Sequence, residues 1–266
     1  MIEIFGTLVL EGVERVSQLI LVEKKEGYAV LTLNRPEKMN AISRQMTKEF
    51  YQAVIDLKKE NLKFLVVTGA GDRAFCAGGD LRELHGEMNA EEAYAVLHPM
   101  KEVLYELATF PVPTIAVLNG QARGGGCEIA TSCDFRYGTE RASFGFVQAN
   151  LGIIPGWGGG TLLYQRVKSD VAAHWLMDAD MYTAEQVYRI GWLHKMITVN
   201  WKGDIFSSFL NKTPEQMKIF KQQYMDHMDF HTLSERMDHE VRQCSLLWES
   251  DEHKEAVRNF EAKRKR

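Results

Sequence analysis

Short apolar runs alternate with amphipathic stretches over the first third of the chain. Residues 19–23 and 28–33 are β-rich runs joined by a charged turn that contains Gly27, a pattern that predicts a hairpin. Residues 43–59 carry apolar side chains at helical spacing, with a serine suited to be the N-cap at the first position. The apolar run 64–68 then predicts a buried strand. The pattern favours an α/β fold.

The same order of elements recurs downstream. Residues 81–110 have a helical period that ends before two prolines, and residues 114–118 form the next apolar run. Two more strand-like pieces follow at 134–137 and 142–144. Strands and helices that alternate in this way predict a core of repeated strand-strand-helix units.

Beyond residue 160 the chain is mainly helical. The segments 161–167, 171–177 and 184–190 have helical patterns, and 195–199 is the one clear strand expected there. Residues 213–258 contain almost no glycine and hold a methionine-rich apolar stripe made of Met217, Phe220, Met225, Met228, Leu233, Met237, Val241 and Leu247. Such a stripe is usually core, and its length also makes it a candidate subunit interface.

These patterns divide the chain into a core at 1–200, whose first 18 residues are an N-terminal extension, and a helical C-terminal region at 201–266. The composition is 45% hydrophobic and 26% charged, which is ordinary for a globular protein and excludes a disordered or fibrous class. The net charge of −4, without a basic stripe, argues against nucleic-acid binding.

The N-terminal residues and the cysteines indicate the cellular compartment. Residues 1–18 lack a basic segment followed by a long apolar core, so we expect no secretory signal, and no apolar run approaches the ~20 residues of a membrane span. The cysteines Cys76, Cys127, Cys133 and Cys244 have no paired metal-ligand spacing. We therefore predict free thiols, no metal site and a cytoplasmic protein.

Two glycine turns are the first candidates for chemistry. The triplet Gly124-Gly125-Gly126 separates the strand at 114–118 from a helical stretch at 127–133, and Glu128 falls in the first turn of that helix. Unpaired N–H groups at a helix start favour a negatively charged oxygen, and glycine lets it approach. A tight turn alone would also need these glycines, and a carboxylate there also gains ~0.3–1 kcal/mol from the helix dipole without any chemistry.

The second turn, at residues 75–81, reads FCAGGDL and again follows a buried strand. Two turns of this kind can offer two backbone N–H groups to one oxygen. That arrangement is an oxyanion hole, in which each donor aimed at developing charge lowers the barrier by ~3–4 kcal/mol.

Five motifs in order carry a resemblance to a known family. They are LNRPEKMNAIS, AFCAGGDL, NGQARGGGCEIATSCDFR, LGIIPGWGGG and KEAVRNFEAKRKR. Together they resemble the enoyl-CoA hydratase/isomerase family, also called crotonases, over residues 19–266. The resemblance implies a crotonase-like spiral of repeated ββα units in two roughly perpendicular sheets, with a helical C-terminal oligomerisation region. It also implies a homotrimer or homohexamer, an acyl-CoA thioester substrate, and no cofactor beyond the coenzyme A of that substrate.

The resemblance also assigns site residues. The backbone N–H groups of Ala77 and Gly125 would hold the thioester carbonyl oxygen, and Glu128 would be the main acid and base. Residues that match the coenzyme A site of the family are Lys38, Met39, Ala74, Asp80, Leu81, Phe260 and Lys263. For the last two, a role at the end of the C-terminal helix is nearly as good an interpretation.

One position departs from the pattern of hydratases. Those enzymes carry two glutamates, the second within FGxPE, and here the matching segment 144–148 reads FGFVQ. Gln148 therefore stands where the second carboxylate belongs. An amide can position water but cannot take its proton.

This departure leaves three alternatives for the function. The first is an enzyme of hydratase/isomerase type, for which hydration is disfavoured and double-bond isomerisation needs only one proton carrier. The second is a decarboxylase of a methyl- or ethylmalonyl-CoA-type substrate, because decarboxylation also needs only one proton carrier and residues 146–159 and 133–136 resemble ethylmalonyl-CoA decarboxylases. The third is a non-catalytic scaffold.

A second proton carrier is sought at residues 83–98, where the candidates are His85, Glu87, Tyr94 and His98. Trp157 is expected near the floor of the acyl pocket.

Overall fold

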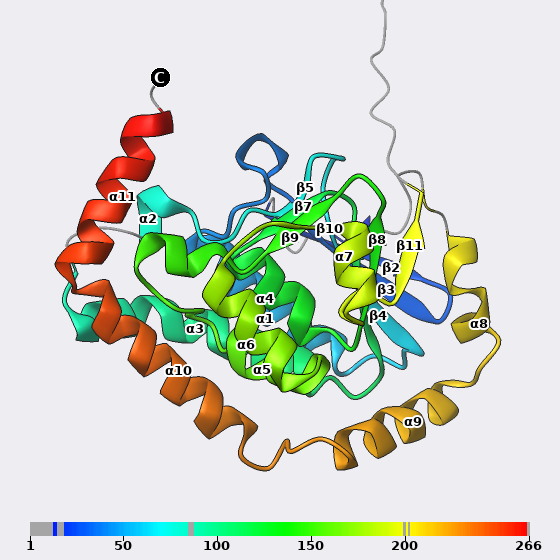
Figure 1. Cartoon of the computed structure of the whole chain (residues 1–266). Coiled ribbons are helices and arrows are strands. Elements are labelled where there is room, and N and C mark those ends of the chain that lie inside the picture. Colours follow the sequence, from blue (N-terminus) through cyan, green and yellow to red (C-terminus); the bar gives the residue numbers. More distant parts are fainter. Residues whose placement is uncertain (1–12, 15–18, 85–87, 199–200, 202, 265–266) are drawn as a thin grey trace, which may run out of the picture.

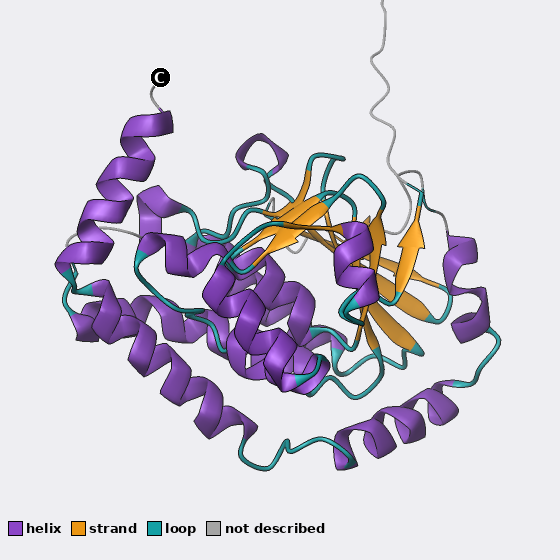
Figure 2. Ribbon diagram, viewed as in Figure 1, coloured by secondary structure: helices purple, strands orange, loops and turns teal. Residues whose placement is uncertain are grey.

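The computed structural model describes residues 13–14, 19–84, 88–198, 201 and 203–264, and its strands form two sheets (Figures 1 and 2). The larger sheet has the order β1 (Val13–Glu14), β2 (Ile20–Lys25), β3 (Tyr28–Leu33), β4 (Phe64–Gly69), β6 (Thr114–Leu118), β8 (Phe135–Thr139) and β11 (Lys195–Ile197). The smaller sheet has the order β10 (Tyr182–Thr183), β9 (Ser143–Gly145), β7 (Gln121–Arg123) and β5 (Ala74–Cys76).

The predicted hairpin is confirmed. Strands β2 and β3 pair antiparallel, with Gly27 in the turn at a φ of +83°, a conformation that favours glycine. From β3 onward the larger sheet is parallel. Strands β4 and β6 are buried along their whole length, which explains their continuous apolar sequences.

The repeated unit places one strand in each sheet. The pairs β4 and β5, β6 and β7, and β8 and β9 each contribute the first strand to the larger sheet and the second to the smaller one. The prediction of strand-strand-helix repeats is therefore confirmed. Strands β5 and β7 were not expected, because the glycine turns appeared to follow the buried strands directly. At three residues each, they are too short to give a recognisable alternating pattern.

Most of the helices lie on one side of the strands (Figure 2), while residues 205–210 pack on the other face of the larger sheet. Those of the core are α1 (Arg44–Leu57), α2 (Leu81–Leu84), α3 (Ala90–Ala108), α4 (Gly125–Ser132), α5 (Gly159–Arg166), α6 (Ser169–Asp178) and α7 (Ala184–Arg189), with 3-10 turns η1 (Pro36–Lys38) and η2 (Val147–Leu151). Ser43 caps α1 as predicted, since its side chain accepts a hydrogen bond from the Met46 N–H. The single helix expected at 81–110 is instead two helices, because Asn89 starts α3 with a capping box.

The C-terminal segments form an outer arc around the core (Figure 1). They are η3 (Gly203–Phe206), α8 (Ser207–Leu210), α9 (Pro214–Asp226), α10 (Leu233–Trp248) and α11 (Asp251–Arg264). Leu233, Met237 and Val241 of α10 are fully buried in the same hydrophobic cluster as the core strands and helices. This part of the methionine-rich stripe is therefore core, whereas Phe220 on α9 remains 55% exposed. An oligomeric interface at this stripe stays a prediction.

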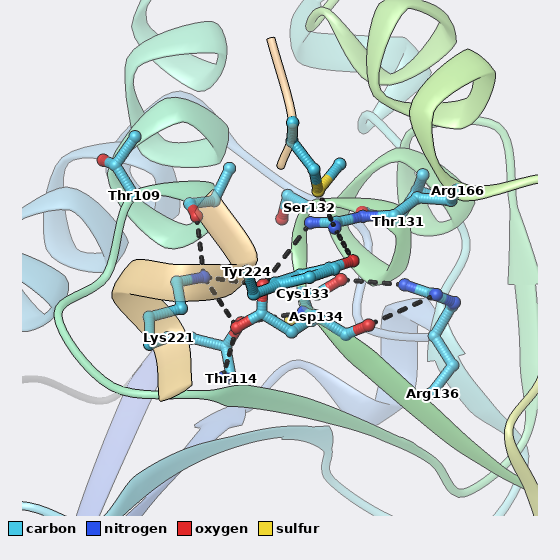
Figure 3. Close-up of polar contacts among 12 residues, drawn as sticks. Thr109, Thr114, Thr131, Ser132, Cys133, Asp134, Arg136, Arg166, Lys221 and Tyr224 are labelled. Atoms are coloured by element: carbon cyan, nitrogen blue, oxygen red, sulfur yellow. Dashed lines mark hydrogen bonds and ion pairs between the residues drawn. The ribbon is translucent and has the colours of Figure 1, made fainter. Parts of the chain in front are cut away.

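A buried charged cluster holds α9 against the core (Figure 3). The Lys221 ammonium donates to both oxygens of the Asp134 carboxylate, at 2.6 and 2.7 Å, and to the Ala108 carbonyl at 2.9 Å. Arg166 lies 3.5 Å from the same carboxylate and donates to the Tyr224 hydroxyl. Burial lowers the pKa of Lys221, and the Asp134 carboxylate opposes this effect. Buried charges need such partners, so this cluster is a structural anchor for α9.

Other predicted features can be placed against the structure. All four cysteines are buried and unpaired. Within the described residues, no helix is long and apolar enough to cross a membrane, and no group of three or more histidine, cysteine or acidic side chains is arranged to hold a metal ion.

Candidate active site

A cavity of about 900 Å³ lies where both glycine turns meet η2 and the start of α5. The four predicted catalytic residues all line it, namely Ala77, Gly125, Glu128 and Gln148. Trp157 also lines this cavity, as expected for a residue near its floor. The far wall includes Trp248 and the α11 residues Ala256 and Asn259, so the C-terminal helices of the same chain contribute to the cavity.

Glu128 is held from all sides by hydrogen-bond donors. Its Oε2 accepts from the N–H groups of Trp157 and Gly159, both at 2.9 Å. Its Oε1 accepts from Gln148 Nε2 at 2.9 Å and from the Gly156 N–H at 3.3 Å. An ionised carboxylate offers about four lone-pair sites, so all of its acceptor capacity is in use.

The position of Glu128 depends on a glycine opposite it. A Cβ at Gly159 would lie 2.4 Å from the Glu128 Cβ, so only glycine lets α5 start this close to α4. The Glu128 side chain is 2% exposed. Burial raises its pKa above the ordinary value, and the four hydrogen bonds act in the opposite direction. A carboxyl with a raised pKa beside a cavity is suited to exchange a proton with a bound molecule.

Among the described residues, Gln148 is the one side-chain donor to this carboxylate. Its Nε2 contacts Glu128, while its Oε1 is buried and has no hydrogen-bond partner among the described residues. The backbone N–H groups are fixed toward Glu128, whereas the side-chain amide of Gln148 can rotate and present its oxygen to Glu128 in place of its nitrogen. If Glu128 gains a proton, Gln148 Oε1 can accept the new O–H in place of the present contact.

The two glycine turns lie against each other. A Cβ on Gly78, which has a φ of +94°, would lie 3.3 Å from the Gly125 nitrogen. Gly125 is the first residue of α4, so its N–H has no acceptor within the helix. The indole of Trp157 packs on the other side of Gly125, where an added Cβ would lie 2.1 Å from Cζ3. Glycine is therefore required at both positions for the turns to meet.

The second predicted oxyanion donor is already engaged. The Ala77 N–H donates to the Met39 carbonyl at 3.0 Å. A substrate oxygen would have to replace or share this acceptor before Ala77 and Gly125 could bind it together. The Ala77 assignment therefore stays a prediction that depends on this rearrangement.

Most of the predicted coenzyme A residues line a second cavity. It measures about 410 Å³ and is lined in part by Lys38, Met39, Asp80 and Leu81. The two cavities share the lining residues Ala77, Gly79, Leu81 and Arg123. They are therefore neighbouring parts of one larger depression.

Ala74 is not brought to either cavity. It is 1% exposed in β5, and its carbonyl accepts a hydrogen bond from Asn40 Nδ2 at 2.8 Å. Asn40 is fully buried and follows Met39, and both have a positive φ. Ala74 thus anchors the turn that presents Lys38 and Met39 instead of contacting a ligand with its side chain.

Asp80 lines the second cavity and is tied to the same loop. Its carboxylate is 3.0 Å from Arg35 Nη2, and Arg35 Nη1 donates to the Ala41 carbonyl at 2.8 Å. Phe260 and Lys263 belong to α11, but their side chains lie outside what the structure describes. Their proposed contact with coenzyme A stays a prediction.

The second proton carriers sought at residues 83–98 do not line the main cavity where they are described. The Tyr94 hydroxyl donates to Asp238 on α10, and His98 lies 3.3 Å from Glu102. Both side chains therefore face the contact between α3 and α10. His85 and Glu87 fall outside the described residues.

Sequence reasoning missed three charged residues near the site. Asp180 and Arg123, both exposed, line the main cavity. Glu240 on α10 binds the start of α5 directly beside Glu128. Arg123 precedes the glycine triplet and could have been noticed for that reason, whereas no local signal points to Asp180 or Glu240.

Comparison with known proteins agrees with this geometry. The family model described as enoyl-CoA hydratase/isomerase matches residues 23–266. A crotonyl-CoA hydratase from Syntrophomonas wolfei is 37% identical over 179 residues, which is 67% of this chain and 68% of that protein. An ethylmalonyl-CoA decarboxylase from Xenopus laevis is 33% identical over 179 residues, or 67% of this chain and 60% of that protein.

Solved structures confirm the predicted fold. The crystal structure of an enoyl-CoA hydratase from Bacillus anthracis superposes with a TM-score of 0.75 at 27% identity, covering 92% of this chain and 97% of the other. The mixed α/β spiral and its C-terminal helices are therefore the fold expected from the motifs. On the family match and the shared fold, this chain belongs to the enoyl-CoA hydratase/isomerase family of acyl-CoA enzymes.

Proposed function

We propose that the chain transforms an acyl-CoA thioester through an enolate, with Glu128 as the group that takes and returns the proton. The carbonyl oxygen would lie against the Gly125 N–H at the start of α4. A helix start favours negative charge, so it stabilises the oxygen as the proton leaves the adjacent carbon. Glu128, on the same helix one turn later, would receive that proton.

The observation that carries the proposal is the hydrogen bond from Gln148 Nε2 to Glu128 Oε1 at 2.9 Å. In this place an amide orients Glu128 without titrating. Isomerisation of a double bond needs one base that removes a proton and returns it to another carbon of the same substrate. Proton transfer by one positioned side chain contributes typically ~10²–10⁴-fold, so one carboxyl suffices for this reaction.

Hydration is less well supported. It requires a base for water and an acid for the carbon, and Gln148 can be neither. The unpaired Gln148 Oε1 can still accept a hydrogen bond from a water molecule. Glu128 would then have to take a proton from that water and later give one to the carbon, which makes hydration a slower activity here.

Decarboxylation is the second candidate. Loss of CO2 from a methyl- or ethylmalonyl-type thioester yields the enolate directly, and protonated Glu128 would then supply a proton to the carbon. Arg123 favours this reaction, because its cationic side chain lines both cavities and can bind a substrate carboxylate. The similarity to an ethylmalonyl-CoA decarboxylase supports the same reaction.

The rest of the substrate fits the neighbouring cavity. We place the coenzyme A portion along Lys38, Met39, Asp80 and Leu81, with Phe260 and Lys263 as further contacts. A homotrimer or homohexamer, with the exposed apolar side chains of α9 in its interface, belongs to the same proposal. Size-exclusion chromatography with light scattering tests it, and a monomer at micromolar concentration argues against it.

The deciding experiment offers the purified protein crotonyl-CoA, a 3-enoyl-CoA and methyl- and ethylmalonyl-CoA, and follows products by mass spectrometry in D2O. Isomerisation gives a product with the same atoms as the substrate, except that deuterium replaces hydrogen if the proton carried by Glu128 exchanges with solvent. Decarboxylation gives a product lighter by CO2. Activity that survives in Glu128→Gln overturns the assigned role of Glu128, and no turnover of any thioester favours the scaffold alternative.

A further inference from the structure

Two carboxylates share the first turn of α5. The Gly159 N–H donates to Glu128 Oε2 at 2.9 Å, and the next N–H, of Gly160, donates to Glu240 Oε1 at 3.0 Å. The Thr161 N–H and hydroxyl both donate to Glu240 Oε2, the hydroxyl at 2.7 Å. Three consecutive N–H groups that have no acceptor within the helix are thus divided between α4 and α10.

The turn before α5 is wedged between the same two helices. Gly159 lies against the Glu128 side chain, as described above. Gly158 has a φ of +86°, and a Cβ there would lie 2.6 Å from the Met237 Cε on α10. Since Met237 is fully buried, α10 cannot move without moving this turn. The backbone of this turn, at residues 156–159, supplies three of the four donors to Glu128.

Glu240 lines a cavity of about 420 Å³ together with Thr161, Arg236 and His239. Ile154 lines both this cavity and the main one, but Glu240 does not line the main cavity, of which Glu128 forms a wall. Glu240 therefore cannot be a group that contacts the substrate from its present position.

We infer that Glu240 is a positioning residue for Glu128: it fixes the start of α5 so that the Gly159 N–H stays bound to Glu128. Without the Glu240 carboxyl the start of α5 is held less firmly, and the hydrogen bond from Gly159 to ionised Glu128 is weakened. Ionised Glu128 is then harder to form. The kinetic part of this inference rests on the proposed function, whereas the positioning part does not.

The charges around Glu240 are consistent with this role. Burial and, after it, the Glu128 carboxylate on α4 raise the pKa of Glu240 to about 8, while the hydrogen bonds from Thr161 and Gly160 act in the opposite direction. Glu128 therefore ionises while Glu240 still holds its proton. From its own helix, Glu235, Arg236 and His239 line the same cavity. Cys244 lies one turn later, where both carboxylates raise its pKa. On α3, His98, Lys101 and Glu102 pair instead with Asp238, Ser234 and each other.

The test is a titration of the Glu128 carboxyl carbon by NMR in protein labelled with ¹³C at glutamate side chains. Glu128→Gln identifies the signal. In Glu240→Gln we expect the midpoint of Glu128 to rise by roughly one pH unit, because the hydrogen bond from Gly159 that favours ionised Glu128 is weakened, whereas Glu240 is protonated in this range and has no charge to lose. Glu235→Gln is the matched control, because it removes an acidic group from the same cavity without a bond to α5, and it should leave the midpoint in place.

A second variant keeps the inference testable if Glu240→Gln does not fold. Thr161→Val removes one donor to Glu240 and keeps the backbone, so Glu240 holds the start of α5 less firmly and the Glu128 midpoint should rise by a smaller amount. An unchanged Glu128 midpoint in whichever of these variants folds overturns the inference.

A kinetic measurement extends the test to function. On a substrate that the wild type turns over, the acidic limb of kcat/KM should move to higher pH in Glu240→Gln and stay in place in Glu235→Gln. An acidic limb that does not move in Glu240→Gln refutes the positioning role. If no thioester is turned over, the proposed function fails while the NMR titration still decides the coupling.

Discussion

Gln148 Nε2 donates to Glu128 Oε1 at 2.9 Å, so a side chain without a titratable proton contacts the buried carboxyl directly. The other three donors to Glu128 belong to the backbone and are fixed in place. The amide is therefore the one partner that can adapt when Glu128 changes its protonation. This relationship limits the chemistry to what one proton carrier can do.

Glu128→Gln should lower turnover by ~10²–10⁴-fold on whatever thioester proves to be the substrate, because it keeps size and removes the proton exchange. It should also destabilise the fold by ~1–3 kcal/mol, since the new amide NH2 must face backbone N–H groups that already donate there. Steady-state kinetics and urea unfolding measure the two effects. Full turnover in this variant would mean that the proton carrier lies elsewhere, with Asp180→Asn as the next variant to test.

Gln148→Glu should raise hydration of crotonyl-CoA above the wild-type level, because it restores a second carboxyl beside the cavity. Two carboxyls at hydrogen-bonding distance cannot both ionise readily, so one of them should titrate at higher pH than Glu128 does in the wild type. The loss of the enoyl-thioester absorbance and its dependence on pH provide both readouts. Gln148→Met, similar in size but without a polar head, is the control and should not gain hydratase activity.

The stability of the protein should fall as pH rises from about 4.5 to about 8. Burial and the neighbouring Glu128 raise the pKa of Glu240 to about 8 in the folded chain, from an ordinary value of 4.5. Between these two pKa values Glu240 holds a proton in the native state that it has lost in the unfolded state. The contribution of Glu240 to the free energy of unfolding is therefore full below its ordinary pKa and is lost as pH rises through its folded-state pKa. Urea unfolding across this range should show a flatter dependence for Glu240→Gln. A wild-type stability that rises over the same window would contradict the prediction.

Gly125→Ala should abolish most activity, because the added methyl would lie 2.1 Å from the Trp157 ring and must displace it. Loss of one oxyanion donor costs ~10²–10³-fold in kcat, and a shift of α4 would have that effect. Tryptophan fluorescence reports the displaced ring, and Trp157→Phe identifies its contribution. Wild-type kinetics together with an unchanged spectrum would show that the turn has room that the structure does not indicate.

Lys221→Met should destabilise the protein by ~3–5 kcal/mol, because it leaves the Asp134 carboxylate buried with a weaker set of partners. The double variant Asp134→Asn with Lys221→Met should recover part of that loss, since no unpaired carboxylate remains. Urea unfolding of the two single variants and the double variant measures the coupling. Equal stability of Lys221→Met and wild type would show that Arg166 alone is sufficient for Asp134.

Much of the site could be predicted from the sequence because its parts are local. Each glycine turn, the apolar strand before it and Glu128 in the first helical turn lie within short stretches of sequence, so their spacing predicts how they are arranged. The replacement of a glutamate by Gln148 can likewise be read from a single position. Ala77, Gly125, Glu128 and Gln148 all line one cavity, and the catalytic roles assigned to them stay a prediction.

Only the tertiary structure decided which backbone N–H groups already have an acceptor and which residues distant in the sequence contact the site. The Ala77 N–H is taken by Met39, and Glu240 reaches the start of α5 from about 80 residues away. Neither contact leaves a periodic signal, because each depends on how separate helices and turns pack against one another. Sequence patterns record which face of an element is buried, whereas packing determines which partner it meets there.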